Sequence, residues 1–159
     1  MLSRETDSLK SMANARDCEQ VVRRIGSLTP DSPRLWGSMS VQGMLCHLAD
    51  SYQIALGERA AAPVTMPLPG PMMKAVALWS PMRWPRNVKT LKEVEQGCGG
   101  STPRPFEDER VRLLRMMARF RSAATLAEVR HPMFGRMTQA DWMRWGYLHA
   151  DHHLRQFSA

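Results

Sequence analysis

The sequence Trp142-Met-Arg-Trp145-Gly-Tyr-Leu-His149-Ala-Asp-His152-His153-Leu-Arg-Gln156-Phe157 is the most informative part of the chain. Its aromatic and imidazole side chains recur every three or four residues, which is the spacing of one face of an α-helix. Thr138 precedes it as an N-cap, and Asp141 completes a capping box three residues later. We expect a helix over 138–156, with one face that carries Trp142, Trp145, Gly146, His149, His153 and Gln156.

His149 and His153 are four residues apart, which separates them by roughly 6 Å along a helix and about 40° around it. Two imidazoles at this spacing can reach one metal ion. Ala150 stands where a zinc protease helix has glutamate, so the protease mechanism is not supported. The alternative is a pair of half-buried histidines on an aromatic face, each satisfied by a hydrogen bond.

His47 is the third candidate ligand, on a second expected helix that begins at the N-cap Ser40 and stops at Gly57. It falls on or beside the face that we expect to be buried, which carries Val41, Met44, Leu45, Leu48, Tyr52 and Leu56. Three neutral imidazoles from two helices leave an open position for water or substrate. Because imidazole must be neutral to bind, the sequence predicts metal release below about pH 6.

Asp50 lies one turn beyond His47 and has three possible roles. It can orient an imidazole, act as a general base, or be a solvated helix carboxylate, and the last reading is favoured. His152 competes with its neighbours as a ligand, and otherwise supports the site or faces solvent. We expect His131 to pack within a loop and Cys46 to be a buried inert thiol. Tyr52 and Gln156 are expected to line the pocket, and Asp151 has the same three possible roles as Asp50.

Helical periodicity dominates the rest of the chain, and no convincing strand alternation is present. A first helix is expected over 14–25, ended by Gly26, with Cys18, Val21, Val22 and Ile25 on its buried face. Another is expected over 106–127, with Leu113, Met116, Met117, Phe120, Ala124 and Ala127 on its buried face. The chain therefore predicts an all-α four-helix bundle in a single domain over 1–159.

A long connection over 57–105 separates the second and third main helices and holds eight of the eleven prolines. Short helices are plausible over 72–79 and 88–96, and we expect the segment to wrap over one end of the bundle. Residues 74–92 are basic and contain no acid: Lys74, Arg83, Arg86, Lys89 and Lys92, interleaved with Trp79 and Trp84. Such a segment can touch a phosphate or a membrane surface, but a basic loop that covers the bundle is favoured.

Composition places the chain among ordinary globular proteins. It has 159 residues, of which 43% are hydrophobic and 23% charged, and a net charge of +7 without any base-reading motif, so no nucleic-acid role is expected. Three separated cysteines indicate a reducing compartment and no disulfide framework. The first seven residues lack an apolar core, and no run of about 18 apolar residues exists, which predicts a cytoplasmic protein without a membrane span.

Four motifs are distinctive: Trp36-Gly37-Ser-Met39, Met44-Leu-Cys-His47-Leu, His131-Pro-Met-Phe-Gly135-Arg-Met-Thr138 and His149-Ala-Asp-His152-His153-Leu-Arg-Gln156-Phe157. With these motifs the chain resembles the DinB-like superfamily. The chain is most similar to an uncharacterised branch that ends in His-x-x-His-His-Leu-Arg-Gln-Phe, and the resemblance covers about residues 24–157.

The resemblance implies a four-helix bundle whose metal ligands correspond to His47, His149 and His153. Zinc, nickel, iron or manganese occupies such sites, and members are often dimers, so a homodimer is possible. The superfamily includes thiol-dependent transferases and proteins described as metal-dependent hydrolases, so the resemblance implies a small-molecule substrate and, for a transferase, a low-molecular-weight thiol. Arg83, Arg86 and Lys89 can attract a carboxylate-bearing cosubstrate. The alternative is a non-catalytic helical stress or interaction protein with a vestigial or absent metal site.

Overall fold

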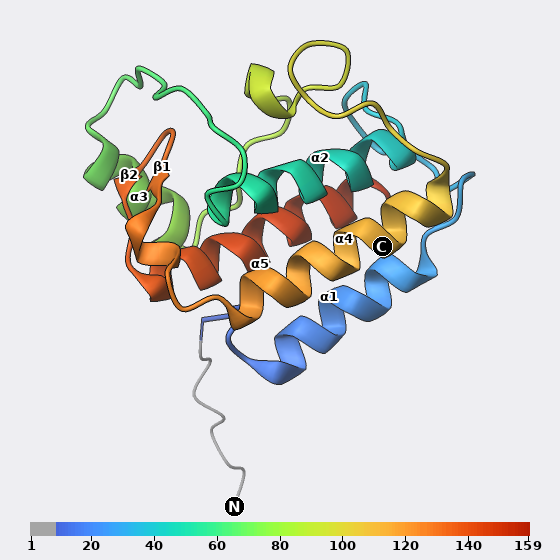
Figure 1. Cartoon of the computed structure of the whole chain (residues 1–159), viewed down its shortest axis with the longest axis horizontal. Coiled ribbons are helices and arrows are strands. Elements are labelled where there is room, and N and C mark those ends of the chain that lie inside the picture. The colour runs from blue at the N-terminus through green and yellow to red at the C-terminus, as the bar shows by residue number, and fades with distance from the viewer. Residues whose placement is uncertain (1–8) are drawn as a thin grey trace, which may run out of the picture.

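The computed structural model describes residues 9–159, and most of this range is helical (Figure 1). This agrees with the all-α class predicted from the sequence. The first seven residues, whose lack of an apolar core supports the predicted cytoplasmic location, lie outside the described residues. None of the helices within 9–159 is long and apolar enough to cross a membrane.

Four long helices lie side by side: α1 (Ala15–Ser27), α2 (Val41–Ala55), α4 (Phe106–Ser122) and α5 (Gln139–Gln156) (Figure 1). Helix α2 packs against α4 and α5, and α1 covers the other side of the same two helices. The core lies between them and is filled by large apolar side chains, among them Trp142, Phe120, Tyr52, Met44 and Leu113.

The beginnings of three helices follow from their capping residues. Asn14 caps α1 by accepting hydrogen bonds from two backbone N–H groups, and Ser40 caps α2 by accepting one from Gly43. Thr138 and Asp141 form the capping box of α5. Each cap satisfies N–H groups that the first turn of a helix leaves without partners, so these beginnings were predictable from the sequence.

Two helix ends differ from the prediction. Helix α4 stops at Ser122 instead of Ala127, and the chain then buries Leu126 in a short 3-10 turn, η2 (Leu126–Glu128). Ala124 and Ala127, predicted to be buried, are exposed. Alanine favours helix locally, but burying leucine stabilises the turn more than two exposed alanines would stabilise a longer helix.

Helix α1 also differs from the prediction, in its end and in one residue of its buried face. It continues through Gly26, and Leu28 is its C-cap. Val22, predicted on the buried face, is exposed. A glycine near a helix end is therefore not sufficient to stop it when the next residues still form the helical hydrogen bonds.

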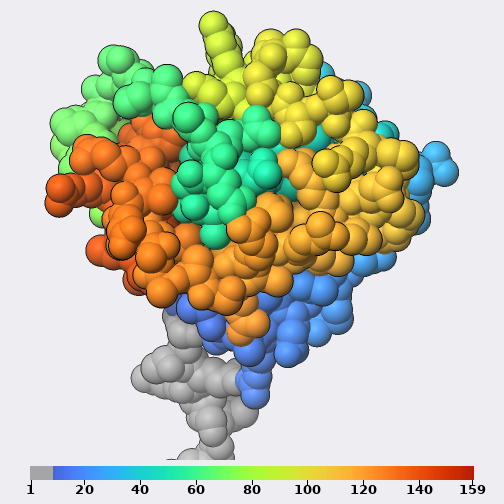
Figure 2. Space-filling model, viewed as in Figure 1, coloured from blue at the N-terminus to red at the C-terminus, as the bar shows by residue number. Residues whose placement is uncertain are grey.

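The long connection holds one helix, α3 (Gly70–Trp79), close to the range predicted over 72–79. The second predicted helix, over 88–96, is wrong, because only a single 3-10 turn forms there, η1 (Lys92–Val94). That turn buries Val94, and the carbonyl oxygen of Val94 has side-chain partners in His47 and Gln96. In the space-filling view the connection, coloured green to yellow, forms the upper edge of the molecule above α2 (Figure 2).

A short hairpin between α4 and α5 was not predicted. Its strands β1 (Arg130–His131) and β2 (Gly135–Arg136) are antiparallel and too short to show alternation in the sequence. Helix α3 packs against β2 and α5. A Cβ atom at Gly70 would lie 2.9 Å from the carbonyl oxygen of Phe134, so glycine is what lets α3 approach the hairpin this closely.

Candidate metal centre

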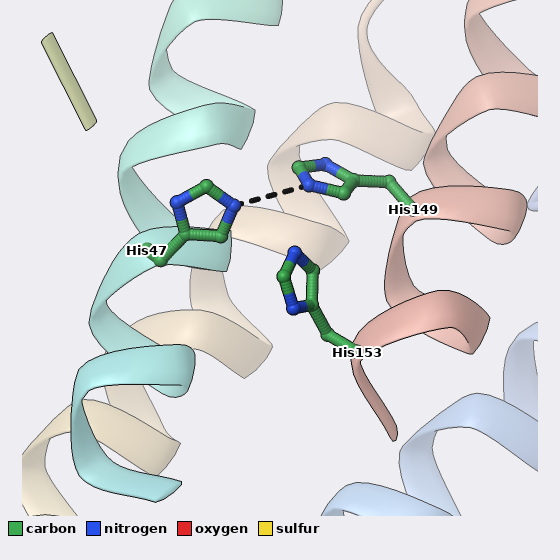
Figure 3. Close-up of side chains that lie close together, drawn as sticks. All are labelled: His47, His149 and His153. Atoms are coloured by element: carbon green, nitrogen blue, oxygen red, sulfur yellow. Dashed lines mark hydrogen bonds between the residues drawn. The ribbon is translucent and has the colours of Figure 1, made fainter. Parts of the chain in front are cut away.

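The rings of His47, His149 and His153 converge between α2 and α5 (Figure 3). One nitrogen from each ring lies within 4.8 Å of the others, and the Nε2 atoms of His47 and His149 are 3.1 Å apart. Figure 3 shows a ring nitrogen of His153 pointing toward the space between the other two rings. The structure thus brings together the three histidines that the sequence singled out as metal ligands.

The partner of His47 determines which of its nitrogens carries the proton. Its Nδ1 lies 3.1 Å from the carbonyl oxygen of Val94, in the turn η1. A carbonyl oxygen can only accept, so Nδ1 donates and Nε2 presents its lone pair to the centre. This is the arrangement in which a carbonyl orients a metal-binding imidazole.

Gln156 does the same for His153. Its amide nitrogen donates to the carbonyl oxygen of Trp36 at 2.8 Å, which leaves its Oε1 facing Nδ1 of His153 at 3.1 Å. Because Oε1 accepts, Nδ1 of His153 carries the proton and its Nε2 has a free lone pair. Gln156 was predicted to line a pocket, and the structure instead gives it this orienting contact.

The three rings suit a cation chemically. Burial lowers the pKa of His47, and it lowers the pKa values of His149 and His153 to well below their ordinary range, with smaller contributions from the neighbouring imidazoles. All three rings are therefore neutral at pH 7, as metal ligands must be. Tetrahedral zinc with Zn–N bonds of about 2.0–2.1 Å holds its nitrogens about 3.3 Å apart, close to the observed 3.1 Å.

Two further histidines surround the centre without joining the ligand group. His131 is buried against Phe134, and its Nδ1 accepts hydrogen bonds from the N–H groups of Met133 and Phe134. Burial lowers the pKa of His131 to about 3, which fits its predicted packing role. His152 contacts the edge of His153 and lies near Trp84, and its buried Nδ1 has no hydrogen-bond partner within residues 9–159.

Asp50 belongs to a separate cluster on the α4 side of α2. It is completely buried, so the favoured reading of a solvated carboxylate is wrong. Its oxygens accept from Arg112, from Arg59 and from both the backbone N–H and hydroxyl of Ser101. Burial alone would raise the pKa of Asp50, but these hydrogen bonds hold it below its ordinary value. It gives His47 no hydrogen bond and does not line the cavity described below.

The other polar residues named from the sequence take structural roles. Burial raises the pKa of Cys46 to about 11, as expected for an inert thiol. Tyr52 donates a 2.9 Å hydrogen bond to the carbonyl oxygen of Gly146 in the core and does not line the cavity. Asp151 is paired with Arg24 and Arg155.

A cavity of about 440 Å³ opens over the three histidines. The walls are mostly apolar and come from α3, the hairpin, α5 and residues 82–91 of the connection. Beyond the length of the connection, no local pattern predicts these walls, because α2, α3, the hairpin, α5 and the connection all contribute to them. A volume of this size is typical of small-molecule sites, and it lets a molecule from outside reach the centre.

Comparison with known families identifies a match that covers nearly the whole chain. The family described as "Protein of unknown function (DUF1569)" matches residues 8–159. No curated protein and no solved structure matches the chain.

Proposed function

We propose that this chain, which belongs to the DUF1569 family, is a metal-dependent enzyme of the DinB-like superfamily. His47, His149 and His153 would hold one divalent transition ion, and the reaction would be thiol-dependent transfer or hydrolysis. The observation that carries this proposal is the convergence of three neutral imidazoles at the floor of an apolar cavity.

The arrangement of the helices supports the DinB-like assignment. One candidate ligand comes from α2 and two come from the last helix, as the resemblance implies for the superfamily. Four long helices pack around one core, and a long connection joins α2 to α4. This connectivity is the one expected of a four-helix bundle with a long crossover.

The three imidazole donors are compatible with the ions expected from the resemblance. Imidazole suits zinc, nickel and iron, and manganese occurs in the superfamily that the chain resembles. An ion in such a site lowers the pKa of a thiol or water bound to it and so makes it nucleophilic at neutral pH. The open side of the three histidines faces the cavity, which distinguishes this site from a closed structural one.

The protein's own residues would orient the ligands and exclude bulk water. The carbonyl of Val94 and the amide of Gln156 hold two of the rings in the tautomer that binds metal through Nε2. The indoles of Trp84 and Trp145 lie beside His149, at ring-centre distances of 5.9 and 5.0 Å. These apolar neighbours lower the local dielectric, which strengthens charge interactions during the reaction.

The direct test is the metal content of the full chain purified without a histidine tag. We expect about one divalent ion per chain, and a His149→Ala variant should lose it. His152→Ala is the matched control, because His152 lies on the same helix but outside the ligand group. Circular dichroism should show that both variants keep their helices.

Activity is tested on the same samples. Metal-loaded wild type should accelerate either displacement of chloride from 1-chloro-2,4-dinitrobenzene by a small thiol, which forms the thioether and releases HCl, or hydrolysis of a p-nitrophenyl ester, and His149→Ala should do neither. A folded wild-type chain that takes up none of zinc, nickel, iron(II) or manganese on dialysis would overturn the metal site and favour the non-catalytic alternative.

A further inference from the structure

The structure separates the five basic residues of segment 74–92 into distinct groups. Lys74 forms an ion pair with Asp141 at 2.8 Å, and the guanidinium of Arg86 stacks over Trp36 at 4.4 Å. Lys92 is exposed and lies outside the cavity. Three of the five cations are thus either used by the fold or turned away from the site.

The remaining two, Arg83 and Lys89, line the cavity. Neither has a hydrogen bond or ion pair with any residue in 9–159, and no described Asp or Glu lines the same cavity. Both are exposed, whereas His47 is buried, so the positive charge lies toward the mouth and the histidines toward the floor. A cavity with unpaired cations and no acid favours an anionic ligand.

Trp84 holds this part of the connection beside the metal centre. Its indole N–H donates to the carbonyl oxygen of Ala77 at 2.8 Å, and its ring lies near His149 and His152. Arg83 directly precedes Trp84 in the sequence, so the contacts of Trp84 also hold the backbone of Arg83 near the site. The charge is therefore held at the site without being neutralised there.

The remaining wall is apolar and sets the shape of the ligand. Methionine, valine and aromatic side chains form most of it, among them Met66, Met73, Val76, Met82, Trp84 and Val88. Burying a hydrocarbon chain against such a wall is favourable in proportion to the apolar area removed from water. Flexible methionines also let the wall adapt to different chains or rings.

We propose that the cavity binds a small amphiphilic carboxylate, with its carboxylate at Arg83 and Lys89 and its apolar body along the wall toward the histidines. As the substrate class of the enzyme this rests on the proposed function, whereas the binding itself does not require a metal. Arg83 provides the planar pair of donors that matches a carboxylate, and Lys89 adds a second point charge.

Calorimetric titration with octanoate, octanamide and octylamine tests the proposal on the full chain. The three probes share an apolar body and differ in the charge of the head group. We expect octanoate to bind at least about 10-fold more tightly than octanamide, because charge-assisted hydrogen bonds are roughly twice as strong as neutral ones. Octylamine should bind weakest, and octanoate should bind with or without bound zinc.

Two double variants separate local charge from net charge. Arg83→Gln with Lys89→Gln should remove the preference for octanoate over octanamide and leave octanamide binding within about two-fold. The control is Arg115→Gln with Lys92→Gln, which lowers net charge equally at exposed positions outside the cavity. It should retain the preference. Charge reversal, Arg83→Glu with Lys89→Glu, should shift the preference to octylamine.

Several outcomes would overturn the proposal. Equal binding of octanoate and octanamide would show that the cations do not select the ligand. Octanoate binding that needs zinc and survives the Arg83 and Lys89 variants would place the carboxylate on the ion instead. No binding of octanoate by a chain with stoichiometric metal would end this inference while leaving the proposed function standing, because metal content is measured separately.

Discussion

Helix α2 carries two buried polar groups one turn apart, and their surroundings differ in a way that separates function from structure. His47 faces α5 and meets two other imidazoles, whereas Asp50 faces α4 and meets Arg112. The charge of Asp50 is compensated by two guanidinium groups and Ser101. At the histidines, no described acid or amide belongs to the group in which a ring nitrogen from each residue lies within 4.8 Å of the others.

The difference shows how to recognise each kind of cluster. A buried carboxylate needs partners that belong to the fold, because an unpaired charge in the interior is very unfavourable. Neutral imidazoles do not, so they can remain together and still accept a cation from outside. Both clusters bury titratable groups. They differ because the carboxylate is already paired with groups of the fold, whereas the neutral imidazoles can still accept a cation.

The largest expected effect comes from breaking the ion-pair cluster. Arg112→Met removes the buried partner of both Asp50 and Glu109. We expect the free energy of unfolding to fall by about 3 kcal/mol, since the carboxylates stay buried and lose a charged partner. Urea denaturation followed by circular dichroism measures it, and the folded fraction should still bind one metal ion per chain.

Arg115→Met is the control on the same helix, three residues further on. Arg115 is exposed, so its replacement should change stability by no more than about 0.5 kcal/mol. If the two variants were equally stable, the Asp50 cluster would not support the fold as its burial implies. Loss of metal in the folded Arg112 variant would mean that the two clusters are coupled.

Zinc should stabilise the folded chain through the histidine cluster and not through the Asp50 cluster, and acid should remove this stabilisation. At 100 times its dissociation constant, zinc raises the free energy of unfolding by about 2.7 kcal/mol, in wild type and Arg112→Met but not in His149→Ala. Burial lowers the pKa values of His149 and His153 in the folded chain, whereas unfolded histidine takes up a proton near pH 6.5. Stability therefore declines as the pH falls below 6.5, because the unfolded chain binds more protons.

The sequence alone predicts metal release below about pH 6. Burial of the histidines moves the expected release to a lower pH. Folded imidazoles with lowered pKa values keep the ion to lower pH, so zinc release should coincide with loss of helix. Parallel measurements of bound zinc and of ellipticity from pH 7 to pH 4 check this. Release near pH 6 from a chain that keeps its helices would show that the three rings titrate normally and are not desolvated.

A smaller effect should follow from removing the contact that orients His153. Gln156→Leu deletes the acceptor of its Nδ1 proton and is expected to weaken zinc binding by about 10- to 100-fold. Gln139→Leu is the control, because Gln139 lies on the same helix and also donates to a carbonyl, that of Ala123. Competition with a chelator of known affinity measures both. Equal zinc affinity in the two variants would show that Gln156 only supports the fold.

Much of the scaffold could be predicted because local chemistry specifies it. Asn14, Ser40 and Thr138 begin their helices as capping residues should. The spacing of His149 and His153 places them on one helix face whatever the rest of the chain does. The end of α4 could not be predicted, because it depends on the burial of Leu126 against other elements.

The surroundings of the site were less predictable than its ligands. Nothing in the sequence places the carbonyl of Val94 against His47, or Arg112 beside Asp50, since these partners lie 47 and 62 residues away. The homodimer, the thiol and the absence of nucleic-acid binding stay predictions. So do the identity of the ion and the cytoplasmic location.

The sequence by itself determined where the four long helices lie, apart from the end of α4, and the pair of histidines on the last one, because capping, periodicity and i, i+4 spacing act over a few residues. Tertiary structure alone decided that His47 joins that pair, that Asp50 is sequestered by arginines, and that Arg83 and Lys89 remain unpaired at the mouth of a cavity. These outcomes depend on how distant segments pack, and packing is determined by the burial of the whole chain and not by any local pattern.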